Sequence, residues 1–175
     1  MKKLLYSLMF VVLLSTFPAL GKTPNQVKSA FLYQIAKFIE FNKHSTQQPI
    51  SFCFYDIEQG PGALLNTNNG LKINNQQIKI ILIKKSQSIS ELSWVCDITY
   101  IDERLENDIL PLWTDTISLD TLTVGESINF LEAGGIASLV QEGNKIRLYI
   151  NKQQMMRQNF KVQSRLLAVS KFYPN

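Results

Sequence analysis

Two cysteines are the first residues of this sequence whose chemistry can be judged from type and spacing. Cys53 and Cys96 are the only cysteines in the chain, and 43 residues (96 − 53) separate them. No Cys-x-x-Cys spacing occurs, so a thiol-exchange enzyme is not expected. In an oxidising compartment an even pair favours a structural disulfide, which for a loop of this size would stabilise the fold by roughly 4 kcal/mol. Two free buried thiols are the alternative.

Groups that could act in catalysis or hold a metal are scarce. His44 is the sole histidine, and it lies in the polar stretch FNKHSTQQP, where a histidine is ordinarily solvated. Its neighbour Ser45 is not thereby a nucleophile, because adjacency in sequence does not give the geometry of a nucleophile and its base. Asp102, Glu103 and Glu106 stand at a predicted helix N-terminus, where acidic groups stabilise the helix dipole. We therefore predict no catalytic residues, no metal site and no cofactor.

The first 21 residues have the pattern of a secretory signal peptide. Lys2 and Lys3 precede an uncharged apolar run over 4–14, and small residues allow cleavage after Gly21. A membrane anchor is the alternative, since the uncharged stretch is near the length needed to span a bilayer. We predict cleavage, export to a bacterial periplasm, and a single domain over residues 22–175.

Charge and motifs argue against nucleic acid and nucleotide partners. The formal net charge falls from +4 to +2 (4 − 2) once Lys2 and Lys3 are removed, and the remaining positive charge is scattered. A nucleic-acid-binding domain usually carries a concentrated basic face. The stretch GPGALLNTNNG lacks both the Gly-Lys-Ser/Thr ending of a phosphate loop and the GxGxxG spacing.

Strands and helices alternate along the rest of the chain. Helices are expected over 25–42, 63–68, 86–95, 103–110 and 127–133. Strands are expected over 50–56, 76–84, 96–102 and 116–120, with a turn within 121–126. A hairpin over 136–151 and a final helix over 164–172 close the chain. This order predicts an α/β fold with a mostly parallel central sheet flanked by helices, a C-terminal antiparallel hairpin and a final helix.

The order of the first three strands can be inferred in part. A flavodoxin-like order, 2-1-3, places the strand of Cys53 beside the strand that begins at Cys96. A disulfide needs this adjacency because its α-carbons lie within about 7 Å of each other. The nearly continuous apolar run of the strand over 76–84 also predicts that it is covered on both faces.

The opening helix, KSAFLYQIAKFIEFN, is more apolar than packing on a sheet requires. At 100° per residue, one arc of the helix is suited to cover a sheet, and it contains Val27, Phe31, Leu32, Ile35, Ala36, Phe38 and Ile39. Ala30, Tyr33 and Phe41 fall outside that arc, so Tyr33 and Phe41 are candidate partner-binding residues. The alternative is that they contact the C-terminal helix of the same domain. Lys28 points into the apolar arc, and its stem is expected to carry the charge outward to water.

Several stretches, in order, resemble the YfiR-like family of bacterial periplasmic proteins: VKSAFLYQIAKFIEF, ISFCFYD, CDITYID, LTVGESINFLEAGGIASLVQEGNKIRLYINKQQM and FKVQSRLLAVSKF. The resemblance implies a repressor that holds an inner-membrane diguanylate cyclase inactive by binding its periplasmic part. It also implies an outer-membrane lipoprotein that removes the repressor, a homodimer, and a disulfide at Cys53 and Cys96. A second bridge of the family has no counterpart here, and EFN stands where an aromatic residue followed by proline is expected.

The residues and the resemblance together leave three hypotheses. The first is a regulatory binding protein that sequesters the periplasmic sensor part of an inner-membrane signalling protein. The second is a periplasmic small-ligand-binding module that gates a partner protein. The third is an enzyme, which would need a cleft that brings His44 together with acidic residues and a serine.

Overall fold

The structure is a computed structural model. It describes residues 21–41, 48–55, 60–67, 70–87, 89–112 and 120–174. The predicted signal peptide, His44 and nearly all of the predicted strand over 116–120 lie outside these ranges. Within the described ranges, no helix is both long enough and apolar enough to cross a membrane.

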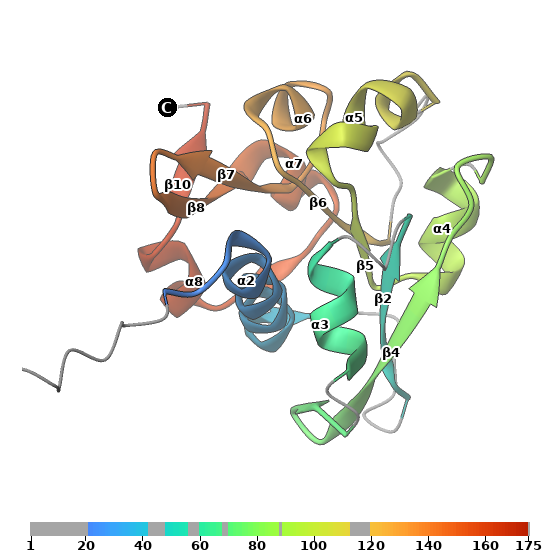
Figure 1. Cartoon of the computed structure of the whole chain (residues 1–175). Helices are drawn as coiled ribbons and strands as arrows, with labels where there is room; N and C mark the ends of the chain where they lie inside the picture. The colour runs from blue at the N-terminus through green and yellow to red at the C-terminus, as the bar shows by residue number, and fades with distance from the viewer. Residues whose placement is uncertain are drawn as a thin grey trace, which may run out of the picture.

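An eight-stranded sheet with the order β10-β8-β7-β6-β5-β2-β4-β3 forms the centre of the fold (Figure 1). Its strands are β2 (Ile50–Phe54), β3 (Lys72–Ile73), β4 (Gln76–Leu82), β5 (Ile98–Tyr100), β6 (Leu122–Gly125), β7 (Ala137–Glu142), β8 (Lys145–Asn151) and β10 (Lys171–Tyr173). The five strands from β4 to β7 in this order pair in parallel, and β7 and β8 form the antiparallel hairpin. The predicted α/β sheet with its closing hairpin is confirmed, and so is the order 2-1-3, which appears as β4-β2-β5.

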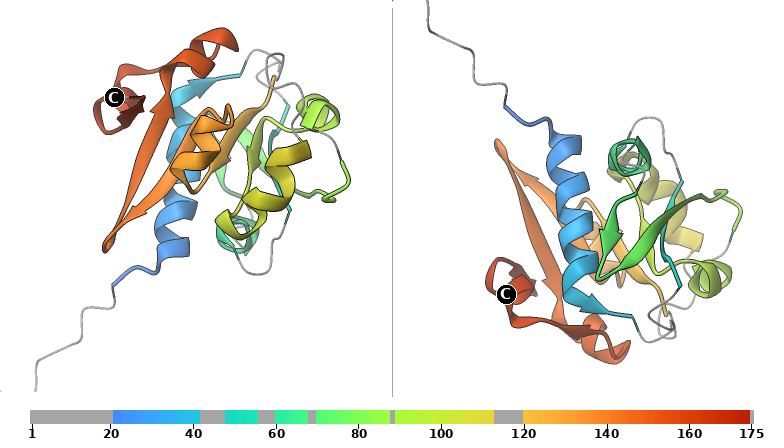
Figure 2. Two further views of the ribbon diagram at one scale, coloured as in Figure 1. Left: turned by 90° about the horizontal axis from the view of Figure 1, so that it is seen from above. Right: turned by 90° about the horizontal axis from the view of Figure 1, so that it is seen from below.

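Helices cover both faces of the sheet. They are α2 (Pro24–Phe38), α3 (Pro61–Thr67), α4 (Ile89–Val95), α5 (Glu103–Ile109) with the 3-10 turn η1 (Leu110–Leu112), α6 (Ile128–Glu132), α7 (Lys152–Arg157) and α8 (Ser164–Ala168). The two views of Figure 2 place α2 and α3 on one face and α4, α5 and α6 on the other. The core divides in the same way, since α2 and α3 share one apolar cluster while α4 belongs to a second cluster and α5 and α6 to a third.

The opening helix begins where its sequence favours a start. Thr23 caps α2 through a capping box with Gln26, and Pro24 occupies the first turn, where its missing N–H costs nothing. The helix ends earlier than the predicted 42, because Ile39 and Glu40 form β1, which pairs with β9 (Lys161–Val162). This small sheet joins the end of α2 to the chain segment that precedes α8.

Three sequence predictions for strands and helices are wrong, each for a tertiary reason. Residues 122–125 are not a turn but β6, buried along its length between β5 and β7. The predicted final helix is present and begins at Ser164, but it ends at Ala168 rather than at residue 172, because residues 171–173 pair with β8 as the edge strand β10. Strand β4 is only half-covered, because it lies second from the sheet edge, and its Leu82 is 62% exposed.

Candidate functional site

Cys53 and Cys96 form a disulfide in the structure, and the alternative of two free thiols does not occur. Cys53 comes from β2, and Cys96 directly follows α4, with their α-carbons 5.8 Å apart. Both sulfurs lie in an apolar cluster with Ile83 and Leu92. The bridge therefore fastens α4 and the start of β5 to the centre of the sheet.

The carboxyl ends of β2 and β5 border the point where the strand order reverses, which is where open α/β sheets usually bind ligands. Beside it, at the carboxyl ends of β5 and β6, polar side chains of the protein contact one another. Glu126, directly after β6, lies 2.5 Å from the Lys28 ammonium of α2 and accepts a hydrogen bond from the Tyr100 hydroxyl of β5. The Lys28 and Glu126 side chains are only 13% and 6% exposed. The expectation that Lys28 extends to water is therefore wrong, because its ammonium group pairs with the buried Glu126 carboxylate.

Glu106 extends this buried polar cluster toward α6. Its carboxylate accepts the backbone N–H groups of Glu126 at 2.7 Å and of Ser127 at 3.2 Å, and it also accepts the Ser127 hydroxyl. The Ser127 oxygen in turn accepts the Phe130 N–H at 3.1 Å and caps α6. Glu106 thus does more than stabilise the dipole of α5, a role that Asp102 fills as N-cap by accepting the Arg104 N–H at 3.0 Å.

Protonation equilibria follow from this packing. Burial raises the pKa of Glu106, an effect that the hydrogen bonds from Ser127 and the backbone offset only in part. Burial and the neighbouring Glu126 charge raise the pKa of the Tyr100 hydroxyl, which therefore stays protonated and donates a hydrogen bond to Glu126. Burial alone would raise the pKa of Asp102, but hydrogen bonds from Arg104 and the nearby Lys28 charge hold it below its usual range.

The side chains of the polar cluster mainly contact one another and the backbone. The Ser127 hydroxyl donates to Glu106 and accepts the Phe130 N–H, so its role in the structure is to cap α6. Both oxygens of Glu106 and both oxygens of Glu126 accept internal donors. Among the described residues, no three or more His, Cys, Asp or Glu side chains are grouped so that they could hold a metal ion.

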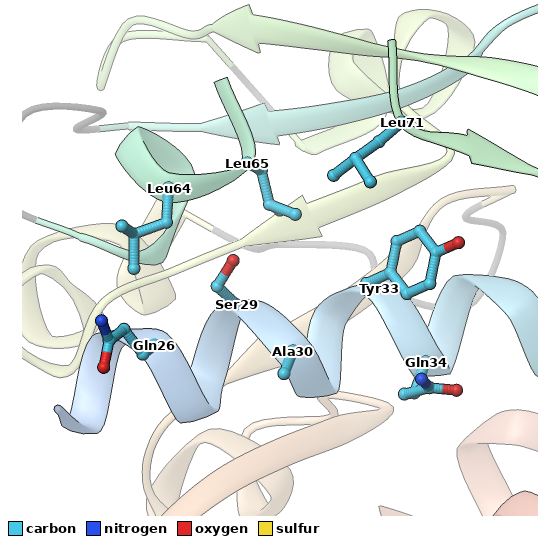
Figure 3. Close-up of a pocket in the computed structure, with 8 residues that line it drawn as sticks. All are labelled: Gln26, Ser29, Ala30, Tyr33, Gln34, Leu64, Leu65 and Leu71. Carbon is cyan, nitrogen blue, oxygen red and sulfur yellow. The ribbon is translucent and has the colours of Figure 1, made fainter. Parts of the chain in front are cut away.

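Open hollows lie instead along α2. The first, between α2 and α3, has a volume of about 360 Å³ (Figure 3) and is lined by Gln26, Ser29, Ala30, Tyr33, Gln34, Leu64, Leu65 and Leu71. The second, which we call the α2–α8 groove, has a volume of about 440 Å³ and is lined by Lys22, Val27, Ala30, Phe31, Gln34, Phe38, Arg165, Leu166 and Val169. Ala30 and Gln34 line both, so the two hollows meet across the outer surface of α2.

The structure places the two predicted partner-binding residues in separate hollows. Tyr33 points toward Leu71 in Figure 3, and its hydroxyl donates to the Lys72 carbonyl at 2.9 Å. Phe41 is half-buried beside a smaller hollow of about 220 Å³ that Ile50 and Asn74 also line. Neither residue lines the α2–α8 groove.

Sequence reasoning missed the α2–α8 groove because it assigned Val27, Phe31 and Phe38 to the arc that covers the sheet. In the structure these three residues are only partly buried, while Leu32, Ile35 and Ala36 carry the packing on the sheet. The apolar run LLAV at 166–169 was the available signal, since a short amphipathic segment at the chain end needs a neighbouring surface.

Comparisons with known proteins give a family and a fold. The model of the family described as YfiR/HmsC-like matches residues 25–171. No curated protein gives a significant match.

Two solved structures are similar to this chain. A conserved domain protein from Vibrio cholerae has 12% sequence identity and a TM-score of 0.50, covering 86% of this chain and 60% of that one. The ABC domain from Streptococcus pneumoniae in complex with L-Trp has 9% identity and a TM-score of 0.49, covering 85% of this chain and 61% of that one. This chain thus spans about 60% of the length of the first structure, and at 12% identity that similarity shows the fold alone.

Proposed function

The chain belongs to the YfiR/HmsC-like family, a family of periplasmic regulatory proteins, and we propose that it represses a membrane signalling protein by binding to it. Its target is the periplasmic sensor part of an inner-membrane protein of the diguanylate cyclase type. The observation that carries the proposal is the family match over residues 25–171.

The mechanism needs binding energy and no chemical reaction. A repressor shifts its target to the inactive conformation only by its difference in affinity for the two conformations. To change the ratio of inactive to active target from 1:99 to 99:1, the repressor must bind the inactive conformation about 10⁴-fold more tightly than the active one. The buried polar cluster, with its donors and acceptors engaged internally, and the half-buried apolar residues of α2 are both compatible with a protein that acts through its surface.

The finer parts of the proposal follow the family. The protein is exported after cleavage behind Gly21, acts as a homodimer, and is released from its target by an outer-membrane lipoprotein. Tyr33 and Phe41 contribute contacts to the partner, each at the rim of its own hollow. The Cys53–Cys96 bridge keeps the binding-competent fold stable in an oxidising compartment.

A second candidate is a small-ligand-binding module that gates a partner. The hollow between α2 and α3 favours it, because three leucines and the amide of Gln26 line the same space (Figure 3). A thermal-shift screen of periplasmic solutes tests this candidate. It loses its support if no compound raises the melting temperature.

The main proposal is tested in the bacterium that encodes the protein. Deleting the gene should raise cellular cyclic-di-GMP, and complementation should restore the lower level. Affinity purification of the tagged protein from detergent-solubilised membranes should recover a membrane cyclase or sensor protein, identified by mass spectrometry. An unchanged cyclic-di-GMP level together with no such protein, under both oxidising and reducing conditions, would overturn the proposal.

A further inference from the structure

The α2–α8 groove is built from two helices that the sheet holds side by side. The β1–β9 pairing and a hydrogen bond from the Gln163 N–H to the Phe38 carbonyl, 2.9 Å long, set the start of α8 beside the end of α2. Leu166 of α8 is buried to 2% exposure in the core. Figure 1 shows α8 alongside α2, at the surface of the molecule.

The floor of the groove is apolar and accessible. Val27, Phe31 and Phe38 pack on the core cluster but keep part of their surface exposed. Val169, directly after α8, is 69% exposed on the opposite wall. A groove whose floor and one wall are both apolar has the form that accepts the apolar face of an amphipathic helix.

Both charged residues among those that line the groove are positive. Lys22 precedes α2 by two residues and lies at one end, whereas Arg165 lies at the other end, where α8 begins beside Phe38. The sequences of α2 and α8 contain no aspartate or glutamate. The acidic residue that follows α2, Glu40, is already paired with Lys161 at 3.9 Å. An occupant that complements this surface carries negative charge at both ends of an apolar stripe.

We propose that the α2–α8 groove is the docking site for an acidic amphipathic helix of the signalling partner. The proposal deepens the function proposed above and rests on it. Helix α2 has 15 residues and α8 has five, so at 1.5 Å per residue the two walls are about 22 Å and about 8 Å long, and both walls together contact about two turns of a bound helix. Apolar anchors at positions i, i+3, i+4 and i+7 enter the groove, and flanking acidic residues meet Lys22 and Arg165.

Photo-cross-linking in the native periplasm tests the location. A benzoylphenylalanine at position 169 should form an adduct with a periplasmic segment of the membrane protein, mapped by mass spectrometry as acidic and helix-forming. The matched control is position 156 on α7, since Met156 is 71% exposed and lies outside the groove. Adducts from position 156 alone, or adducts from position 169 with lipid, with a second copy of this chain or with a basic segment, would overturn the groove assignment.

Charge reversal tests the chemistry. A synthetic peptide of the cross-linked segment serves as the probe, and its affinity is measured for the purified protein. Arg165→Glu should weaken binding at least fivefold, while Arg157→Glu on α7, also exposed and outside the groove, should change it less than twofold. Equal effects of the two reversals would contradict the proposal. If the protein still co-purifies with the membrane protein but these results fail, only the groove is wrong; if co-purification and the cyclic-di-GMP response both fail, the proposed function is wrong.

Discussion

The buried polar cluster and the α2–α8 groove use the same helix in opposite ways. Lys28 turns inward to the Glu126 carboxylate at the carboxyl edge of the sheet, while its neighbour Val27 lines the open groove. At the carboxyl ends of β5 and β6 the protein's own side chains form an ion pair and a hydrogen bond, whereas the groove on the outer side of α2 is open. The polar cluster therefore joins α2 to the sheet, while the open hollows lie along the outer side of the same helix.

Breaking the ion pair of the polar cluster should have the largest effect. Lys28→Met leaves the Glu126 charge buried without its cation, and losing one partner of a buried pair costs about 3–5 kcal/mol. Urea denaturation measures the free energy of unfolding. Lys37→Met, on the exposed side of the same helix, is the matched control and should stay within about 0.5 kcal/mol of the wild type. Similar losses in both variants would remove the distinction between the two regions.

Removing the disulfide should be the next largest change. The double variant Cys53→Ala/Cys96→Ala is expected to lose about 2–4 kcal/mol, because the unfolded chain is no longer restrained by the bridge. The wild type under reducing conditions should approach the same stability in urea denaturation. No difference between oxidised and reduced wild type would show that the bridge contributes nothing to the fold.

A side chain added at the carboxyl end of β6 should lower the free energy of unfolding somewhat less than loss of the disulfide does. A Cβ on Gly125 would lie 2.2 Å from the Phe130 ring, so Gly125→Ala should destabilise the protein by about 1–3 kcal/mol through overpacking. The double variant Gly125→Ala/Phe130→Leu should recover part of the loss in thermal denaturation. A single variant as stable as the wild type would mean that this edge is looser than the structure shows.

Titration of Glu106 should have a smaller effect. Burial raises its folded pKa above the unfolded value, so the folded state holds the proton more tightly, and stability from this group declines as pH rises between the two values. Glu106→Gln removes that decline, and the difference in unfolding free energy between variant and wild type should change across the range just above pH 4.5. Parallel stability curves from pH 4 to 7 would contradict the assigned direction.

A groove variant should leave stability almost unchanged. Val169→Asp places a charge on a side chain that is 69% exposed, so the unfolding free energy should shift by no more than about 0.5 kcal/mol. The same change opposes an acidic partner, and binding of the membrane protein should fall at least tenfold in a co-purification assay. Met156→Asp is the control and should retain binding. Loss of stability in Val169→Asp would place Val169 in the fold rather than on the binding surface.

The sequence predicts the frame of the fold better than its details. The apolar runs of β2, β7 and β8 are long enough to identify. The order β4-β2-β5 is predicted because a disulfide between Cys53 and Cys96 requires their strands to be adjacent. Strands β6 and β10 are missed because each has only three or four residues, and pairing with neighbours decides their conformation.

The candidate site is harder to predict than the fold. The contact among Lys28, Tyr100 and Glu126 joins residues that are far apart in the sequence, and no local pattern predicts it. The α2–α8 groove is also missed, because only some of the apolar residues of α2 pack against the sheet, and the others remain partly exposed. Whether Val27 or Phe31 covers the sheet or the groove depends on where α8 lies, and that is fixed by the β1–β9 pairing.

Helix α8 is anchored on both sides by strands. Strand β9 pairs with β1 immediately before it, and β10 pairs with β8 immediately after it. Main-chain hydrogen bonds of these ladders, rather than adaptable side chains, therefore determine how far apart the two walls stand. The groove is therefore preformed, and it loses little conformational entropy when a partner helix binds. Differences in affinity between partner helices should then come mainly from their dissociation rates.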